Sequence, residues 1–122
     1  MKTMRDGTLL LVVLVLAAGC TSRTREIVKE QYVITDVICD RIDNSDPQKQ
    51  PTRQELYGFV VGTRDTFDTL KKKGTSISIS VYATAVTLSD RISKNENIDM
   101  DELRQFVKQT RDAYGLILEK KK

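Results

Sequence analysis

The sequence predicts a mainly α-helical protein, a small bundle of about three helices that follows an N-terminal tether and an extended, β-prone arm. Three observations lead to this fold class. Apolar residues recur at three- and four-residue intervals in three stretches after residue 52. A segment dense in β-branched residues precedes them, and a turn-rich linker separates the two. We therefore divide the chain into residues 1–19, 20–51 and 52–122.

The first segment has the layout of a secretory signal. Lys2 and Arg5 give it a basic start, residues 9–16 are apolar without interruption, and the small residues 17–19 precede Cys20. The apolar run is too short to span a bilayer comfortably, since a spanning helix needs about 20 apolar residues. We predict a signal peptide over residues 1–19; a simple membrane anchor and an ordinary cleaved signal are the alternatives.

The residues Ala17-Ala18-Gly19-Cys20 resemble the lipobox of bacterial lipoproteins. The resemblance implies cleavage between Gly19 and Cys20, and a diacylglyceryl thioether and an N-acyl group on Cys20. Because Thr21 rather than Asp follows the cysteine, it also implies sorting to the inner leaflet of the outer membrane, facing the periplasm. Several acyl chains on one residue suffice for stable anchoring. We expect no cofactor besides these covalent groups.

The amino-acid composition argues against several classes of function. Residues 20–122 suffice for one small domain with a thin core. The chain has no His and a net charge of only +3, so it lacks the commonest general base and metal ligand, and nucleic-acid binding is not implied. The acidic residues near predicted helix starts are better explained by the helix dipole than by catalysis. We expect neither an enzyme nor a metal site.

The segment 26–42 is dense in β-branched residues, and alternation places Tyr32, Ile34, Ile38 and Ile42 on one side. This pattern predicts a strand or extended arm, although a helix fits the spacing of Ile34, Ile38 and Ile42 almost as well. An unpaired strand needs a partner for its backbone. Tyr32, Ile34 and Ile38 are therefore candidate partner-binding residues. The alternative is that the segment packs along the helices that follow.

Cys39 is the only thiol that remains if Cys20 is lipidated. An unpaired thiol in an oxidising compartment tends to find a partner, which makes Cys39 a candidate for an intermolecular disulfide. A buried cysteine that behaves as a small hydrophobe is the alternative.

A turn-rich linker over residues 44–51 leads to Thr52 and Glu55, which form the capping-box pattern of a helix start. The helix is expected to end at the lysines 71–73 and Gly74. Gly58 and Gly62 within it either permit a close helix crossing or are simply tolerated. The apolar stripe of this helix consists of Leu56, Phe59, Val60, Thr63, Phe67 and Leu70.

Two more helices are expected. Residues 75–93 begin with strand-like alternation, but a longer helical stripe favours a helix with a β-prone first turn. After a loop at residues 94–97, Asp99 and Glu102 repeat the capping pattern and a third helix runs to the basic tail 120–122. Short connections favour an up-down-up bundle. The two stripes are Ile77, Val81, Ala85, Leu88 and Ile92, and Leu103, Phe106, Val107, Thr110, Ala113, Tyr114 and Ile117.

The lipobox residues together with Cys39 resemble the outer-membrane lipoprotein subunits of phage spanin complexes. The chain departs from that family in having few prolines and a helical domain. The resemblance implies a disulfide-linked homodimer that binds an inner-membrane spanin subunit and disrupts the outer membrane during host cell lysis. An envelope lipoprotein of a bacterium that binds an envelope complex, and a phage superinfection-exclusion lipoprotein, are the alternatives.

Overall fold

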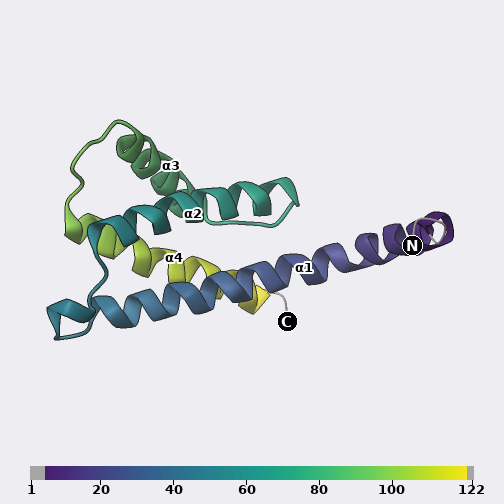
Figure 1. Cartoon of the computed structure of the whole chain (residues 1–122), viewed down its shortest axis with the longest axis horizontal. Helices are drawn as coiled ribbons and strands as arrows, with labels where there is room; N and C mark the ends of the chain where they lie inside the picture. Colours follow the sequence, from purple (N-terminus) through teal and green to yellow (C-terminus); the bar gives the residue numbers. More distant parts are fainter. Residues whose placement is uncertain (1–4, 121–122) are drawn as a thin grey trace.

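The computed structural model describes the backbone of residues 5–120 and the side chains of residues 23–119. The predicted signal peptide, with Gly19 at its end, and the predicted lipidation site Cys20 lie outside the residues whose side chains are described. The described chain contains four α-helices, one short 3-10 helix and no strand, which confirms the mainly α class (Figure 1). Among the described residues, no helix combines the length and apolarity needed to cross a membrane.

Helix α1 spans Arg5–Ile42, so the prediction of an extended arm over residues 26–42 is wrong. The buried side chains Val28, Thr35, Cys39 and Ile42 recur at helical spacing and form one face of α1. A helix satisfies its own backbone hydrogen bonds, whereas a lone strand would leave these groups unpaired. The alternative, that this segment packs along the helices that follow, is confirmed.

The turn after α1 is fixed by Arg41. Its guanidinium donates two hydrogen bonds to the Glu55 carboxylate, at 2.8 and 3.0 Å, and a third to the Lys49 carbonyl at 3.1 Å. The short 3-10 helix Pro47–Lys49 lies in this turn, between α1 and the helix that follows. Asp46 caps it by accepting a hydrogen bond from the Gln48 amide. The predicted linker is therefore ordered by contacts to both neighbouring helices.

Helix α2 spans Arg53–Lys72, and the predicted capping box is confirmed. The Glu55 amide donates to the Thr52 hydroxyl, and the Thr52 amide donates to the Glu55 carboxylate. All six residues of the predicted stripe are buried, and the chain leaves the helix at Gly74, with a φ of 79° that favours glycine. Gly58 and Gly62 do not mediate a close crossing, because a Cβ added at either would meet nothing within 4 Å.

Helix α3 spans Ile79–Ser93 and begins later than predicted. Ser78 caps it by accepting a hydrogen bond from the Val81 amide at 3.3 Å, so residues 75–78 are not the first helical turn. Helix α4 spans Met100–Lys120. Asp99 accepts a hydrogen bond from the Asp101 amide at 3.4 Å, but the carboxylate of Glu102 binds Arg91 on α3 instead of closing a capping box.

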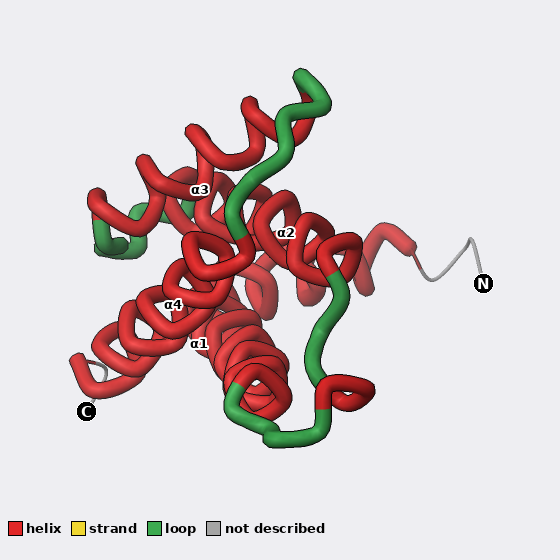
Figure 2. The backbone as a smooth tube through the Cα atoms, turned by 90° about the vertical axis from the view of Figure 1, so that its left-hand side faces the viewer, coloured by secondary structure: helices red, strands yellow, loops and turns green. Residues whose placement is uncertain are grey.

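Helices α1 and α4 run antiparallel and side by side, while α2 and α3 pack on the other side of α4 (Figures 1 and 2). Arg25, near the start of the part of α1 whose side chains are described, donates to the carbonyl of Leu118 near the end of α4, and Asp43 just past α1 pairs with Lys108 at 2.9 Å. The bundle thus has four helices rather than three. Helix α1 contributes Val28, Cys39 and Ile42 to a core that also contains the stripes of α2, α3 and α4.

Candidate interaction surface on helix α1

The outward side of α1 carries three large apolar side chains that are exposed to solvent. Val33 is 60% exposed, Ile34 48% and Val37 53%. Val33 and Val37 lie one helical turn apart with Ile34 beside them, so they form one continuous patch, here called the α1 apolar face. Of the other large exposed apolar residues in the described chain, Ile79 and Val86 lie about two turns apart on the helix Ile79–Ser93, and Leu116 lies on the helix Met100–Lys120. Single exposures are ordinary, whereas a contiguous apolar patch is a candidate site of interaction.

Charged residues border the α1 apolar face along the helix. Glu30 precedes it by one turn and is exposed, and Asp40 follows it. Arg41, one turn beyond Val37, is held by Glu55 on α2. An apolar centre with a polar border is the ordinary anatomy of a protein–protein interface.

The predicted partner-binding residues Tyr32, Ile34 and Ile38 do not form one surface. Ile34 belongs to the α1 apolar face, Ile38 is half-buried and packs against the core, and Tyr32 is turned towards α4. Alternation along a strand would group these three residues, but the helical twist separates them. The sequence interpretation therefore missed Val33 and Val37, whose four-residue spacing on one helix face is the signal that would have identified them.

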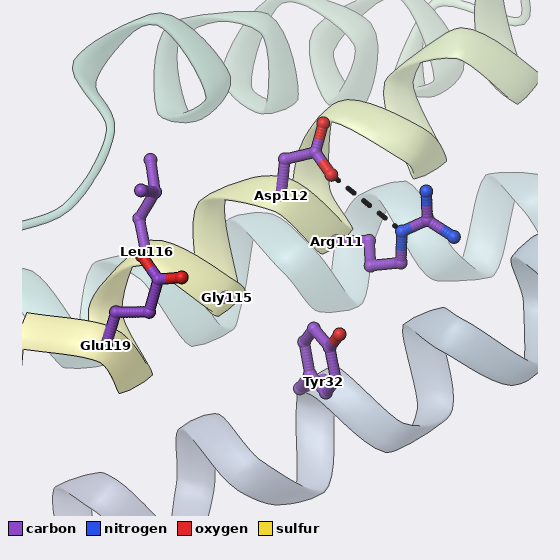
Figure 3. Close-up of a pocket in the computed structure, with 6 residues that line it drawn as sticks. All are labelled: Tyr32, Arg111, Asp112, Gly115, Leu116 and Glu119. Atoms are coloured by element: carbon purple, nitrogen blue, oxygen red, sulfur yellow. Dashed lines mark ion pairs between the residues drawn. The ribbon is translucent and has the colours of Figure 1, made fainter.

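Tyr32 lies in the seam between α1 and α4 (Figure 3). The residue opposite is Gly115 of α4; a Cβ added there would lie 3.6 Å from the Tyr32 ring. Together with Arg111, Asp112, Leu116 and Glu119, these two residues line an open hollow of about 340 Å³.

Two of the three charged residues that line this hollow are already engaged in ion pairs. Arg111 lies 3.7 Å from Asp36 of α1 and 3.8 Å from Asp112 of α4. Within the described residues, no group of three or more His, Cys, Asp or Glu side chains is placed to hold a metal ion. The hollow presents an aromatic edge and ion pairs rather than an assembled nucleophile and base.

Cys39 is completely buried and is a free cysteine. Burial raises the pKa of its thiol above the ordinary value, and the nearby Arg111 guanidinium offsets part of that rise. In this packing the residue behaves as a small hydrophobe. The intermolecular disulfide predicted for Cys39 concerns a second chain and stays a prediction; to form it, α1 would have to separate from α4.

We also compared the chain with protein-family models, curated proteins and solved structures, and none of the three comparisons gives a match.

Proposed function

We propose that the protein is a lipid-anchored binding subunit of the outer membrane, which faces the periplasm and holds a partner protein against the α1 apolar face. The observation that carries this proposal is the contiguous exposure of Val33, Ile34 and Val37 on a helix whose opposite face, with Val28, Cys39 and Ile42, is packed into the core. The lipobox resemblance at Cys20 supports the anchor.

Burial of this face supplies a moderate part of a binding energy. Fully burying an aliphatic side chain contributes about 1.5–3 kcal/mol, so three side chains that are roughly half exposed contribute about 2–4 kcal/mol together. Micromolar affinity requires about 8 kcal/mol. The partner must therefore contact the bordering charged residues as well, and a complementary amphipathic helix is the simplest element that does so.

The position of the face suits a protein that holds its partner at a set distance from a membrane. An α-helix rises 1.5 Å per residue, so Val33 and Val37 stand about 15–21 Å beyond Arg23 along α1. This part of α1 is supported over its length by α4. The partner would meet a rigid rod rather than a flexible tether.

The most specific form of the proposal is the outer subunit of a phage spanin complex, which binds an inner-membrane subunit and disrupts the outer membrane in host cell lysis. The support is the resemblance at residues 17–22 and the surface available for the second subunit. An adjacent or overlapping reading frame that encodes one transmembrane helix and a periplasmic coiled coil is expected for this role. Its absence from a complete lysis region would contradict the spanin role and leave an envelope-complex lipoprotein. A superinfection-exclusion lipoprotein would instead block infection when expressed alone.

The anchor is tested by the mass of the N-terminal peptide of protein purified from membranes. We expect a triacylated Cys20 as the first residue, and we expect Cys20→Ser to yield an unprocessed or soluble protein. Unchanged outer-membrane fractionation of Cys20→Ser would contradict the anchor.

The binding face is tested by a photo-crosslinking amino acid placed at Val33 or Val37 in cells. The matched control is Val86 of α3, which is apolar and 41% exposed but lies outside the face. We expect one discrete crosslinked species from positions 33 and 37, absent from position 86, and lost when Ile34 is also changed to Ser. The same crosslinks from all three positions, or none from any, would contradict the proposed face.

A further inference from the structure

We propose that the end of the helical body nearest the anchor binds the headgroups of anionic phospholipids through a cluster of basic residues. The cluster, here called the basic end surface, consists of Arg23, Arg25, Lys29, Lys71, Lys72 and Lys73. The inference deepens the proposed function and rests on its anchor at Cys20. It assigns the membrane itself as a second ligand, on a surface distinct from the α1 apolar face.

The fold brings these residues together from distant parts of the sequence. Lys73, at the end of α2, lines an open hollow of about 410 Å³ with Arg23, Glu26, Ile27 and Glu30 of α1. The end of α4 reaches the same region, because Arg25 donates to the Leu118 carbonyl at 3.4 Å. In Figure 1 the ends of α2 and α4 lie beside the same part of α1.

The cations of the basic end surface are not neutralised by neighbours. None of the six forms an ion pair within the described residues, although Lys71 lies 5.4 Å from the centre of the Tyr82 ring. Three carboxylates are exposed nearby, so the basic groups outnumber the acidic ones: Glu26, Glu30 and Glu119. At the opposite end of the body, by contrast, Lys49 forms no ion pair with the described residues but most cations are paired: Arg41 with Glu55, Arg91 with Glu96 and Glu102, Lys94 with Asp90, and Lys108 with Asp43.

The helix dipole does not account for the whole cluster. Lysines in the last turn of α2 are favoured by the negative end of that helix. Arg23, Arg25 and Lys29 lie well before the end of α1, however, so they gain nothing from its dipole. A shared external anion accounts for both groups.

The anchor holds this surface at the membrane. Two residues separate Cys20 from Arg23, and the three residue-to-residue steps between them span at most about 11 Å even when fully extended. This distance is close to the Debye length of about 8 Å at physiological ionic strength. Each Lys or Arg near an anionic leaflet favours binding by roughly fivefold.

Residue-level protection in defined bilayers tests the proposal. Protein purified from membranes is placed in nanodiscs of phosphatidylcholine, with or without phosphatidylglycerol, and its lysines are acetylated and quantified by mass spectrometry. We expect Lys29 and Lys71–Lys73 to react severalfold more slowly in the anionic discs, with the difference lost in 1 M salt, where the Debye length is about 3 Å. Lys49 and Lys94, at the other end, serve as internal controls and should react equally in both discs.

The outcomes of this experiment distinguish a failure of the basic end surface from a failure of the lipid anchor at Cys20. Equal reactivity of Lys71–Lys73 in the two discs, with Cys20 shown to be lipidated in the same spectra, would overturn the basic end surface. An unmodified Cys20 would refute the anchor, while selective protection by phosphatidylglycerol would still support the surface.

A charge variant gives a second test. Changing residues 71–73 to Gln removes three exposed cations, and by the same fivefold factor it should shift the docking equilibrium on the order of 100-fold. Lys29 should then lose its protection in anionic discs. The control changes Lys49, Lys94 and Lys108 to Gln, which removes the same charge from the opposite end, and should leave Lys29 protected. Protection of Lys29 that persists in the first variant, or disappears in both, would overturn the proposal.

Discussion

Replacing Tyr114 by Phe should stabilise the protein. The side chain is fully buried in α4, and its ring packs edge-on against Phe67 with 5.4 Å between ring centroids. Its hydroxyl has no hydrogen-bond partner of good geometry. Burial raises the pKa of Tyr114 far above its ordinary value, and the nearby Thr66 hydroxyl offsets only a smaller part of that rise. Tyr114→Phe removes the unsatisfied group and keeps the ring.

The size of the effect follows from the cost of an unsatisfied buried hydroxyl, about 1–3 kcal/mol. The free energy of unfolding should therefore rise by at least about 1 kcal/mol. In a domain of this size, 1 kcal/mol shifts the melting temperature by roughly 4–8 °C. The melting temperature of Tyr114→Phe should thus exceed that of the parent by at least about 4 °C.

Thermal unfolding followed by circular dichroism measures this, on residues 20–122 carrying Cys20→Ser. The matched control is Tyr57→Phe, the same chemical change at a hydroxyl that donates to the Glu96 carbonyl at 3.2 Å and accepts from the Ile98 amide at 3.3 Å. The control should lose about 1 kcal/mol and melt at a lower temperature. A decrease for Tyr114→Phe comparable to that of Tyr57→Phe would show that the Tyr114 hydroxyl is bonded, and the reasoning would be refuted.

Three further predictions concern stability and reactivity. Gly58→Ala and Gly62→Ala should each stabilise α2 by about 0.5–1 kcal/mol, since both sites are open; a lower denaturation midpoint in urea would contradict this. The pKa of Glu55 is lowered from 4.5 to about 2, most by its hydrogen bonds to Arg41 and next by the hydrogen bond from the Thr52 amide, so its stabilising contribution is complete above pH 4.5 and is lost as the pH falls towards 2. Arg41→Gln should flatten that part of the pH profile, and an unchanged slope would exclude the pair as its source. Cys39 should react with a thiol reagent at least about 100-fold more slowly in the folded protein than in urea, and a disulfide-linked dimer that Cys39→Ser abolishes would show that α1 leaves α4.

The helices after residue 52 could be predicted from the sequence because the capping residues and the spacing of the apolar residues indicate the same helices. Every residue of the stripes proposed for α2 and α4 is buried, and Thr52 with Glu55 marks the start of α2 as expected. The start of α3 differs from the prediction by four residues, since alternating Ser and Ile residues at 76–80 mimic a strand and give no clear helix start. There the Ser78 cap decides where the helix begins.

The sequence predicts the wrong structure for residues 26–42 of α1, for a physical reason. Its buried face includes the polar Thr35, whose hydroxyl donates to the Gln31 carbonyl at 2.6 Å, while the apolar Val33 and Val37 are exposed. Both features weaken the helical pattern and leave the β-propensity of the segment as the stronger signal. Two of the three residues that obscure the helix, Val33 and Val37, therefore also belong to the candidate interaction surface.

The pairing of α1 with α4 also determines when the protein can finish folding. Arg25 and the Leu118 carbonyl that it contacts are 93 positions apart in the sequence. A chain that emerges N-terminus first, during synthesis or translocation, exposes the buried face of α1 long before α4 exists to cover it. Contacts between residues so far apart in the sequence form late in folding. Until they form, the exposed apolar face of α1 is prone to associate with other chains. Completion of the fold thus waits for the last helix, so a holdase that shields α1 should raise the yield more than one that acts on α2 or α3.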